Sequence, residues 1–177
     1  MVRKIFNFFI YLLFFIAVLI YFAPKIGLYY LAEQQIKPFG VIISQEEIKD
    51  NGFALSLQNA NISLKGVDTA NIGYTDLKLL VLYNSLNIQK IELSSMADSF
   101  APLNIDSITI THSIINPLFI TGEAKGGFGE GTLNIDILKR VVTIKLIPSK
   151  NMKQKYKSTL RNLKKNSDGE YIYEKNL

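Results

Sequence analysis

The sequence predicts a mainly β protein. A single N-terminal transmembrane helix is followed by a curved antiparallel β-sheet, folded as a half-pipe or a sandwich, with a C-terminal amphipathic helix. Three observations predict this fold. An apolar run covers residues 5–23, strict apolar/polar alternation begins after residue 40, and a helical period returns over residues 149–166. A period of two is typical of half-buried strands, and a period near 3.6 is typical of amphipathic helices.

The apolar run over residues 5–23 is long enough to cross a bilayer. As a helix it would rise about 28 Å, against a hydrocarbon core of about 30 Å. Arg3 and Lys4 precede it, which favours a cytoplasmic tail at residues 1–4 and a periplasmic bulk. A signal peptide is the competing interpretation, but a bulky Tyr21 and a following Pro24 fit a cleavage site poorly. We therefore predict an uncleaved single-pass anchor in a bacterial inner membrane.

The remaining chain is sized for one domain. Residues 24–39 are predicted to continue outward as a helical stalk that Pro38 and Gly40 end, and residues 40–177 to form a periplasmic β-rich domain. The chain has no cysteine, so disulfides and thiolate metal sites are excluded. An exported protein without cysteine is more typical of a bacterial envelope than of a disulfide-stapled ectodomain.

The net charge of +5 is divided unevenly along the chain. Residues 1–25 carry +3, residues 26–148 carry −3 and residues 149–177 carry +5. A nucleic-acid binder would have a basic face through its folded part, so we exclude nucleic acid as a partner.

The predicted helix at residues 149–166 is amphipathic and basic, with Ser149 as its N-cap. Two interpretations are open. The helix contacts anionic headgroups or an acidic partner, or, as we prefer, it caps the open end of the sheet while its basic side chains are solvated. The candidate basic face consists of Lys153, Lys157, Arg161 and Lys164.

Two local patterns refine the strands. Leu57 and Ala60 differ in parity, which predicts a bulge or twist within one long strand. The glycine-rich segment 122–131 could cradle a phosphate, but a second strand follows it at once, so a bend between two strands is preferred. A tight turn at Lys139 and Arg140 predicts the clearest hairpin.

The alternating apolar residues predict one buried face of the sheet. That face is either a closed core or the lining of a groove that takes lipid acyl chains, and alternation alone does not separate the two. The candidate residues for it are Leu55, Leu57, Ile62, Leu64, Leu79, Ile88, Ile108, Leu133 and Ile144.

The sequence offers no organised catalytic site, and we expect a protein that is not an enzyme and has no cofactor. His112 is the only histidine, and the adjacent Ser113 would point to the opposite face of a strand. Two or more His or Cys ligands for zinc are not available. A membrane-tethered hydrolase using scattered carboxylates is the minor alternative.

The layout resembles the type II secretion protein N (GspN) and AsmA-like envelope proteins. The resemblance lies in the short tail, the anchor, the segment NGFALSLQNANISL at 51–64 and the segment GGFGEGTLNI at 126–135. It implies a non-catalytic role in type II secretion assembly or envelope lipid handling. Implied partners are the membrane through residues 5–23, lipid in the β-groove, and envelope β-domain proteins or secretion-machine components. An LptC-like lipopolysaccharide transport subunit is the closest alternative.

Overall fold

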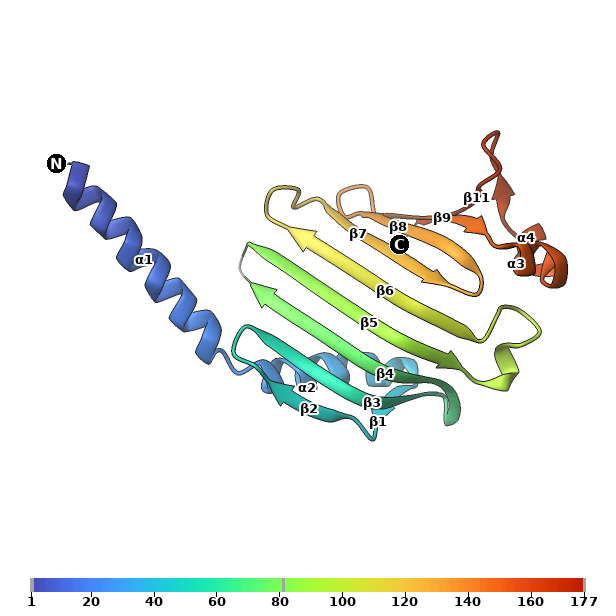
Figure 1. The fold of residues 1–177 in the computed structure, drawn as a ribbon, viewed down its shortest axis with the longest axis horizontal. Coiled ribbons are helices and arrows are strands. Elements are labelled where there is room, and N and C mark those ends of the chain that lie inside the picture. The colour runs from blue at the N-terminus through green and yellow to red at the C-terminus, as the bar shows by residue number, and fades with distance from the viewer. Residues whose placement is uncertain (1, 81, 177) are drawn as a thin grey trace.

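The computed structural model describes residues 2–80 and 82–176, which form an N-terminal helix and a single antiparallel sheet (Figure 1). Helices α1, α2 and the 3-10 turn η1 come first, and α3 and α4 lie near the C-terminus. The bounds are α1 Val2–Phe22, α2 Lys25–Ile36, η1 Lys37–Phe39, β1 Val41–Ser44, β2 Glu47–Asp50, β3 Ala54–Leu64, β4 Val67–Leu80, β5 Tyr83–Leu93, η2 Ser95–Ala97, β6 Asn104–Ser113, β7 Phe119–Gly126, β8 Gly129–Asp136, β9 Val141–Pro148, α3 Lys150–Lys155, α4 Lys157–Arg161, β10 Lys164–Lys165 and β11 Tyr171–Asn176.

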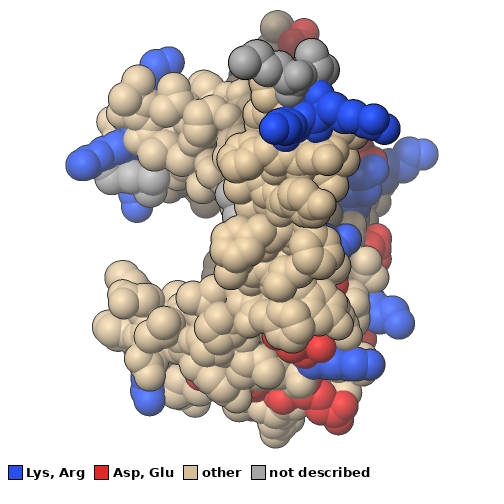
Figure 2. Space-filling view, turned by 90° about the vertical axis from the view of Figure 1, so that its left-hand side faces the viewer, with Lys and Arg blue, Asp and Glu red and all other residues tan. Residues whose placement is uncertain are grey.

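The strands follow one another across the sheet in the order β1-β3-β4-β5-β6-β7-β8-β9-β11-β10, and β2 pairs with β3 beside β1. Short hairpins make most of the connections. The mainly β, antiparallel prediction is confirmed. Seen from the end that carries α1, the molecule has a C-shaped profile, hollowed on one side (Figure 2). The described strands belong to one curved sheet, so the sandwich alternative is wrong.

A line of irregular backbone crosses the sheet where the sequence predicts a parity shift. Asn59 and Lys90 have positive φ values of 56° and 55°, and Gly73 lies between them in the register. A Cβ at Gly73 would come within 3.0 Å of the Lys90 Cβ, so glycine permits the close approach. Because of this break, Leu57 and Ala60 are both buried although their parity differs. The apolar face therefore continues across the kink.

Helix α2 packs on the first strands of the sheet. Its Tyr29 forms a buried cluster with Leu55 and Leu57 of β3. The predicted stalk is thus helical and ends as expected, with Gly40 in a left-handed conformation, but it lies against the sheet. The helix also does not continue α1, because Pro24 disfavours helical backbone in the residue before it.

The prediction of a single helix over residues 149–166 is wrong. The helix breaks at Tyr156, with φ −112° and ψ 38°, and the chain returns to the sheet as β10. Two tertiary hydrogen bonds accompany the break: the Tyr156 hydroxyl donates to Asp98 (3.4 Å) and the Thr159 hydroxyl donates to the Phe100 carbonyl (2.7 Å). The predicted cap is confirmed, since Ser149 Oγ accepts from the Met152 amide at 3.1 Å.

Candidate functional site

The strand register aligns apolar residues into rows that cross the sheet on its concave face. Directly paired residues of antiparallel strands point to the same face, so each row is continuous. One row consists of Leu86, Ile110, Gly122, Leu133, Ile144 and Tyr173, and the next of Ile88, Ile108, Ala124, Gly131, Leu146 and Tyr171.

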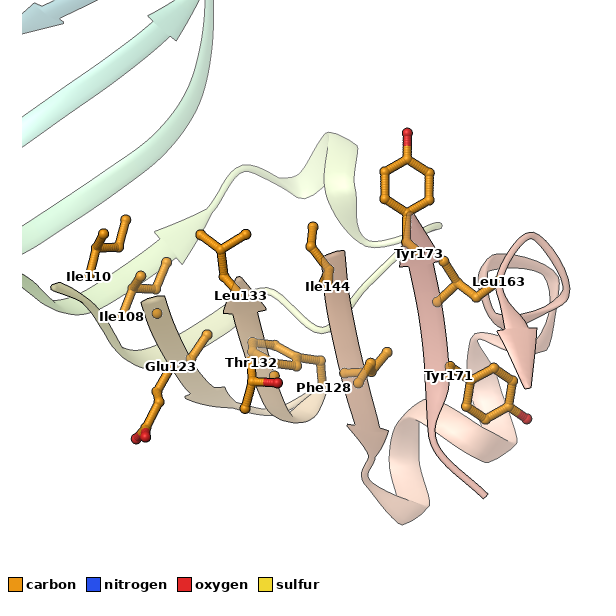
Figure 3. A pocket seen from close by; sticks show the side chains of 14 residues that line it. Ile108, Ile110, Glu123, Phe128, Thr132, Leu133, Ile144, Leu163, Tyr171 and Tyr173 are labelled. Atoms are coloured by element: carbon orange, nitrogen blue, oxygen red, sulfur yellow. The ribbon is translucent and has the colours of Figure 1, made fainter. Parts of the chain in front are cut away.

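A cavity of about 310 Å³ lies over these rows between β6 and β11 (Figure 3). We call it the apolar groove. Ile108, Leu133 and Ile144 form its floor, and Phe128 and Tyr171 stand at the end nearer to the C-terminal helices. Its remaining lining residues are Ile110, Gly122, Glu123, Ala124, Gly131, Thr132, Leu146, Leu163 and Tyr173.

Small residues leave the space that the groove occupies. A Cβ at Gly131 would meet nothing closer than 3.7 Å, which is ordinary contact, so a side chain would fit there. Gly122 is different, because its Cβ would lie only 3.2 Å from the Thr109 carbonyl oxygen. The glycine-rich segment therefore forms the β7–β8 hairpin as predicted, and one of its glycines keeps the groove open.

Helices cover the two ends of the concave face but not the middle. Met152, Tyr156 and Leu160 form a buried cluster against Phe128 and Leu146 at one end, and α2 covers the other end. Between them, Ile144 remains 40% exposed and Tyr173 42% exposed. Such exposure is unusual for apolar residues that share a face with a core.

The structure divides the nine predicted lining residues into groups. Leu55 and Leu57 are buried beneath α2 and belong to the core. Ile62, Ile88 and Ile108 pack around the buried Ala60–Ile72–Ile91 cluster. Ile108 also lines the groove, together with Leu133 and Ile144. Leu64, at the end of β3, is exposed, and Leu79 is half-buried near the end of β4.

Several groove residues were missed by the sequence analysis. Phe128, Tyr171 and Tyr173 lie outside long alternating runs, and Phe128 occupies the turn between β7 and β8. One feature of the sequence pointed to Phe128, because it is an aromatic residue within the glycine-rich segment 122–131, where glycines leave room for a large side chain.

The predicted basic face is divided as well. Lys153, Lys157 and Arg161 line a second concavity of about 300 Å³ together with Leu160 and Tyr171. Lys164 instead lies on β10 and lines a different concavity.

The two adjacent residues considered for catalysis, His112 and Ser113, both have structural partners. His112 Nε2 lies 3.2 Å from the Pro117 carbonyl oxygen, and Ser113 Oγ accepts from the Ile115 amide at 3.1 Å. Within residues 2–80 and 82–176, no three His, Cys, Asp or Glu side chains gather as metal ligands.

Burial, reinforced by Glu46, raises the pKa of Tyr29, whose hydroxyl donates to that carboxylate at 3.2 Å.

The junction between α1 and the sheet is built around a buried lysine. Lys25 is 1% exposed, and its Nζ donates to the carbonyls of Tyr21 and Ala23, each at 3.2 Å. Asp50 on β2 pairs with it at 3.7 Å. The Tyr21 ring packs edge-on against Phe53. The C-terminal end of α1 is therefore part of the packing of the β-domain.

The fold and groove define a mainly β protein whose N-terminal helix, over Arg3–Phe22, is long and apolar enough to cross a membrane. Comparisons with protein-family models, curated proteins and solved structures find no match. The resemblance to GspN, AsmA-like and LptC-like proteins therefore stays a prediction.

Proposed function

We propose that this protein is a membrane-anchored, non-catalytic lipid-binding module of the bacterial envelope, and that its apolar groove takes an acyl chain. One observation carries the proposal: the apolar floor of the concave sheet is uncovered between α2 and the C-terminal helices. A concave, mostly apolar cavity with few polar groups is the usual form of a small-molecule site.

The dimensions suit one acyl chain. The rows that line the groove cross four inter-strand spacings from β6 to β11, about 19 Å at a typical spacing of ~4.8 Å. One leaflet of a bilayer is about 15 Å thick in hydrocarbon. Burying apolar surface stabilises a complex by about 0.8 kcal/mol per methylene. Roughly ten buried methylenes would therefore offset a substantial part of the loss of freedom on binding.

Helix α1 is the membrane anchor in this proposal, with the N-terminus cytoplasmic and the groove in the periplasm. The packing of Tyr21 on Phe53, and the bonds from Lys25 to the carbonyls of Tyr21 in α1 and Ala23 just after it, support a helix retained with the domain rather than removed as a leader. Arg3 and Lys4 before the helix support the orientation.

A photo-crosslinking experiment on the whole chain in its membrane tests the proposal. A benzophenone amino acid replaces Ile144 on the concave face, and in a matched control it replaces the neighbouring Lys145, which points to the convex face. We expect lipid adducts, detected by mass spectrometry, from position 144 and few from position 145. Equal yields at the two positions would contradict a lipid site in the groove.

The sheet edge supports a second candidate function, a scaffold in type II secretion assembly or an LptC-like transport chain. The edge formed by β1 and β2 ends the strand order, and Ile42 on β1 is exposed, whereas the opposite edge is the two-residue β10 with Lys164 and Lys165. Short, lysine-bearing edges resist strand addition, and apolar ones permit it. Crosslinks from position 42 to an envelope β-domain protein, absent from position 164, would support this function.

A further inference from the structure

The apolar groove and a basic concavity share one lining residue, Tyr171, at the end formed by the C-terminal helices. Only the Tyr171 side chain is common to the two linings, so the two spaces adjoin each other at this ring. The groove is lined mainly by β6–β9 and β11, and the cations of the basic concavity come from α3 and α4. A ligand in the groove that extends past Tyr171 would therefore meet the basic side chains of the C-terminal helices.

Three cations line that concavity. Lys153, Lys157 and Arg161 recur every four residues, directly after the buried Met152, Tyr156 and Leu160. The buried apolar residues pack α3 and α4 against the sheet. Because each cation directly follows one of them, the cations lie at the border of this packed surface. The spacing survives the helix break at Tyr156, since all three cations line one concavity.

These three cations form no ion pair with another described residue. The ion pairs among the described residues involve Lys25, Lys78, Lys125 and Lys139, and none involves the three cations of the concavity. The chain from residue 149 onward also carries +5, against −3 for the central part. An anion at this place would be attracted by a local excess of positive charge.

The position of these three cations favours the headgroup of a lipid bound in the groove over the surface of the bilayer as their anionic partner. Figure 1 shows α1 leaving the fold on the side opposite to α3 and α4. With α1 in the membrane, the basic concavity lies away from the entry point of the anchor. The cations are therefore placed to meet the headgroup of a lipid lying in the groove.

We propose that the ligand of the groove is an anionic phospholipid whose acyl chain lies over Leu133 and Ile144 and whose phosphate lies between Lys153, Lys157 and Arg161. This inference rests on the proposed lipid-binding function. Arg and Lys side chains bind phosphate oxygens through charge-assisted hydrogen bonds. The Tyr171 ring lies between the acyl chain in the apolar groove and the phosphate in the basic concavity.

The test compares two diazirine-labelled lipids with identical acyl chains, phosphatidylglycerol and phosphatidylcholine, crosslinked to the whole chain in neutral detergent. We expect phosphatidylglycerol to label the wild-type protein about tenfold more strongly at limiting lipid, as three exposed charge contacts together allow. In the triple variant Lys153→Gln, Lys157→Gln and Arg161→Gln, phosphatidylglycerol labelling should fall to the phosphatidylcholine level while phosphatidylcholine labelling is unchanged.

A charge-matched control variant carries Lys49→Gln, Lys65→Gln and Lys145→Gln. These lysines lie on β2, the β3–β4 turn and β9. This control variant should keep the preference for phosphatidylglycerol. If it loses the preference as well, net charge explains the effect and the headgroup site is refuted.

The remaining outcomes separate the two levels of the proposal. Labelling by neither lipid would refute the lipid-binding function itself. Equal labelling by both lipids in the wild-type protein would leave that function standing and refute the headgroup site. Full competition by inorganic phosphate at equal concentration would show a free-anion site and also refute the inference, because the acyl chain would then contribute nothing.

Discussion

The substitution Ile144→Glu separates an open groove from a closed core. Ile144 is 40% exposed, so about 60% of its surface is buried. Full burial of an isoleucine side chain is worth about 1.5–3 kcal/mol, which makes the loss here about 1–2 kcal/mol. The carboxylate itself keeps access to water in the groove. For a domain of this size, that loss lowers the melting temperature by about 2–8 °C, so the variant should fold.

Two measurements on the whole chain in detergent test this expectation. Circular dichroism gives the melting temperature, and crosslinking to a diazirine-labelled phospholipid gives groove occupancy, which should be lost because a charge now stands on the apolar floor. Leu55→Glu is the matched comparison, since Leu55 is fully buried beneath α2. An unpaired buried carboxylate there costs several kcal/mol, comparable with the whole stability of a domain. If Ile144→Glu unfolds as Leu55→Glu does, the groove is a closed core and the reasoning fails.

Three further predictions follow from the same structure. Gly131→Leu should fill the groove without a backbone clash, reducing lipid crosslinking from position 144 more than Gly131→Ala does; unchanged labelling would show that lipid lies elsewhere. Leu55→Ala should cost about 2–5 kcal/mol and raise hydrogen exchange in α2 before it rises in α3, whereas a uniform rise would argue against local detachment. The amide of Lys139, which donates to Asp136 at 2.8 Å, holds the pKa of that carboxyl below its usual 3.8. The stabilisation is thus present above the unfolded pKa and lost as pH falls through the folded pKa, and Asp136→Asn should abolish this acid dependence in an NMR titration of the β8–β9 turn.

Several features could be predicted because they depend on near neighbours in the chain. The parity shift between Leu57 and Ala60 predicted the irregular backbone at Asn59. The N-cap at Ser149 and the hairpin turn at Arg140 were equally local. Each of these depends on backbone conformations and hydrogen bonds within a few residues, which the sequence specifies directly.

The errors concern contacts between distant segments. Nothing near Tyr156 in the sequence indicates that Asp98 will accept from its hydroxyl at the residue where the first C-terminal helix ends. Nor does the helical pattern of residues 25–36 reveal that Tyr29 packs on Leu55 and Leu57. The candidate groove was incomplete for the same reason, because Phe128 and Tyr171 reach it only through the pairing of β7–β9 with β11.

The sequence by itself determined the apolar N-terminal helix, the mainly antiparallel strands and the identity of the face that carries Ile and Leu. These follow from periodicity, since side-chain direction is a local property of helix and strand. Only the tertiary structure decided that the sheet curves as a single layer, that helices cover its ends alone, and that Ile144 is half open while Leu55 is sealed. The physical reason is that alternation specifies which face avoids water, whereas the segment that covers that face is chosen by long-range packing.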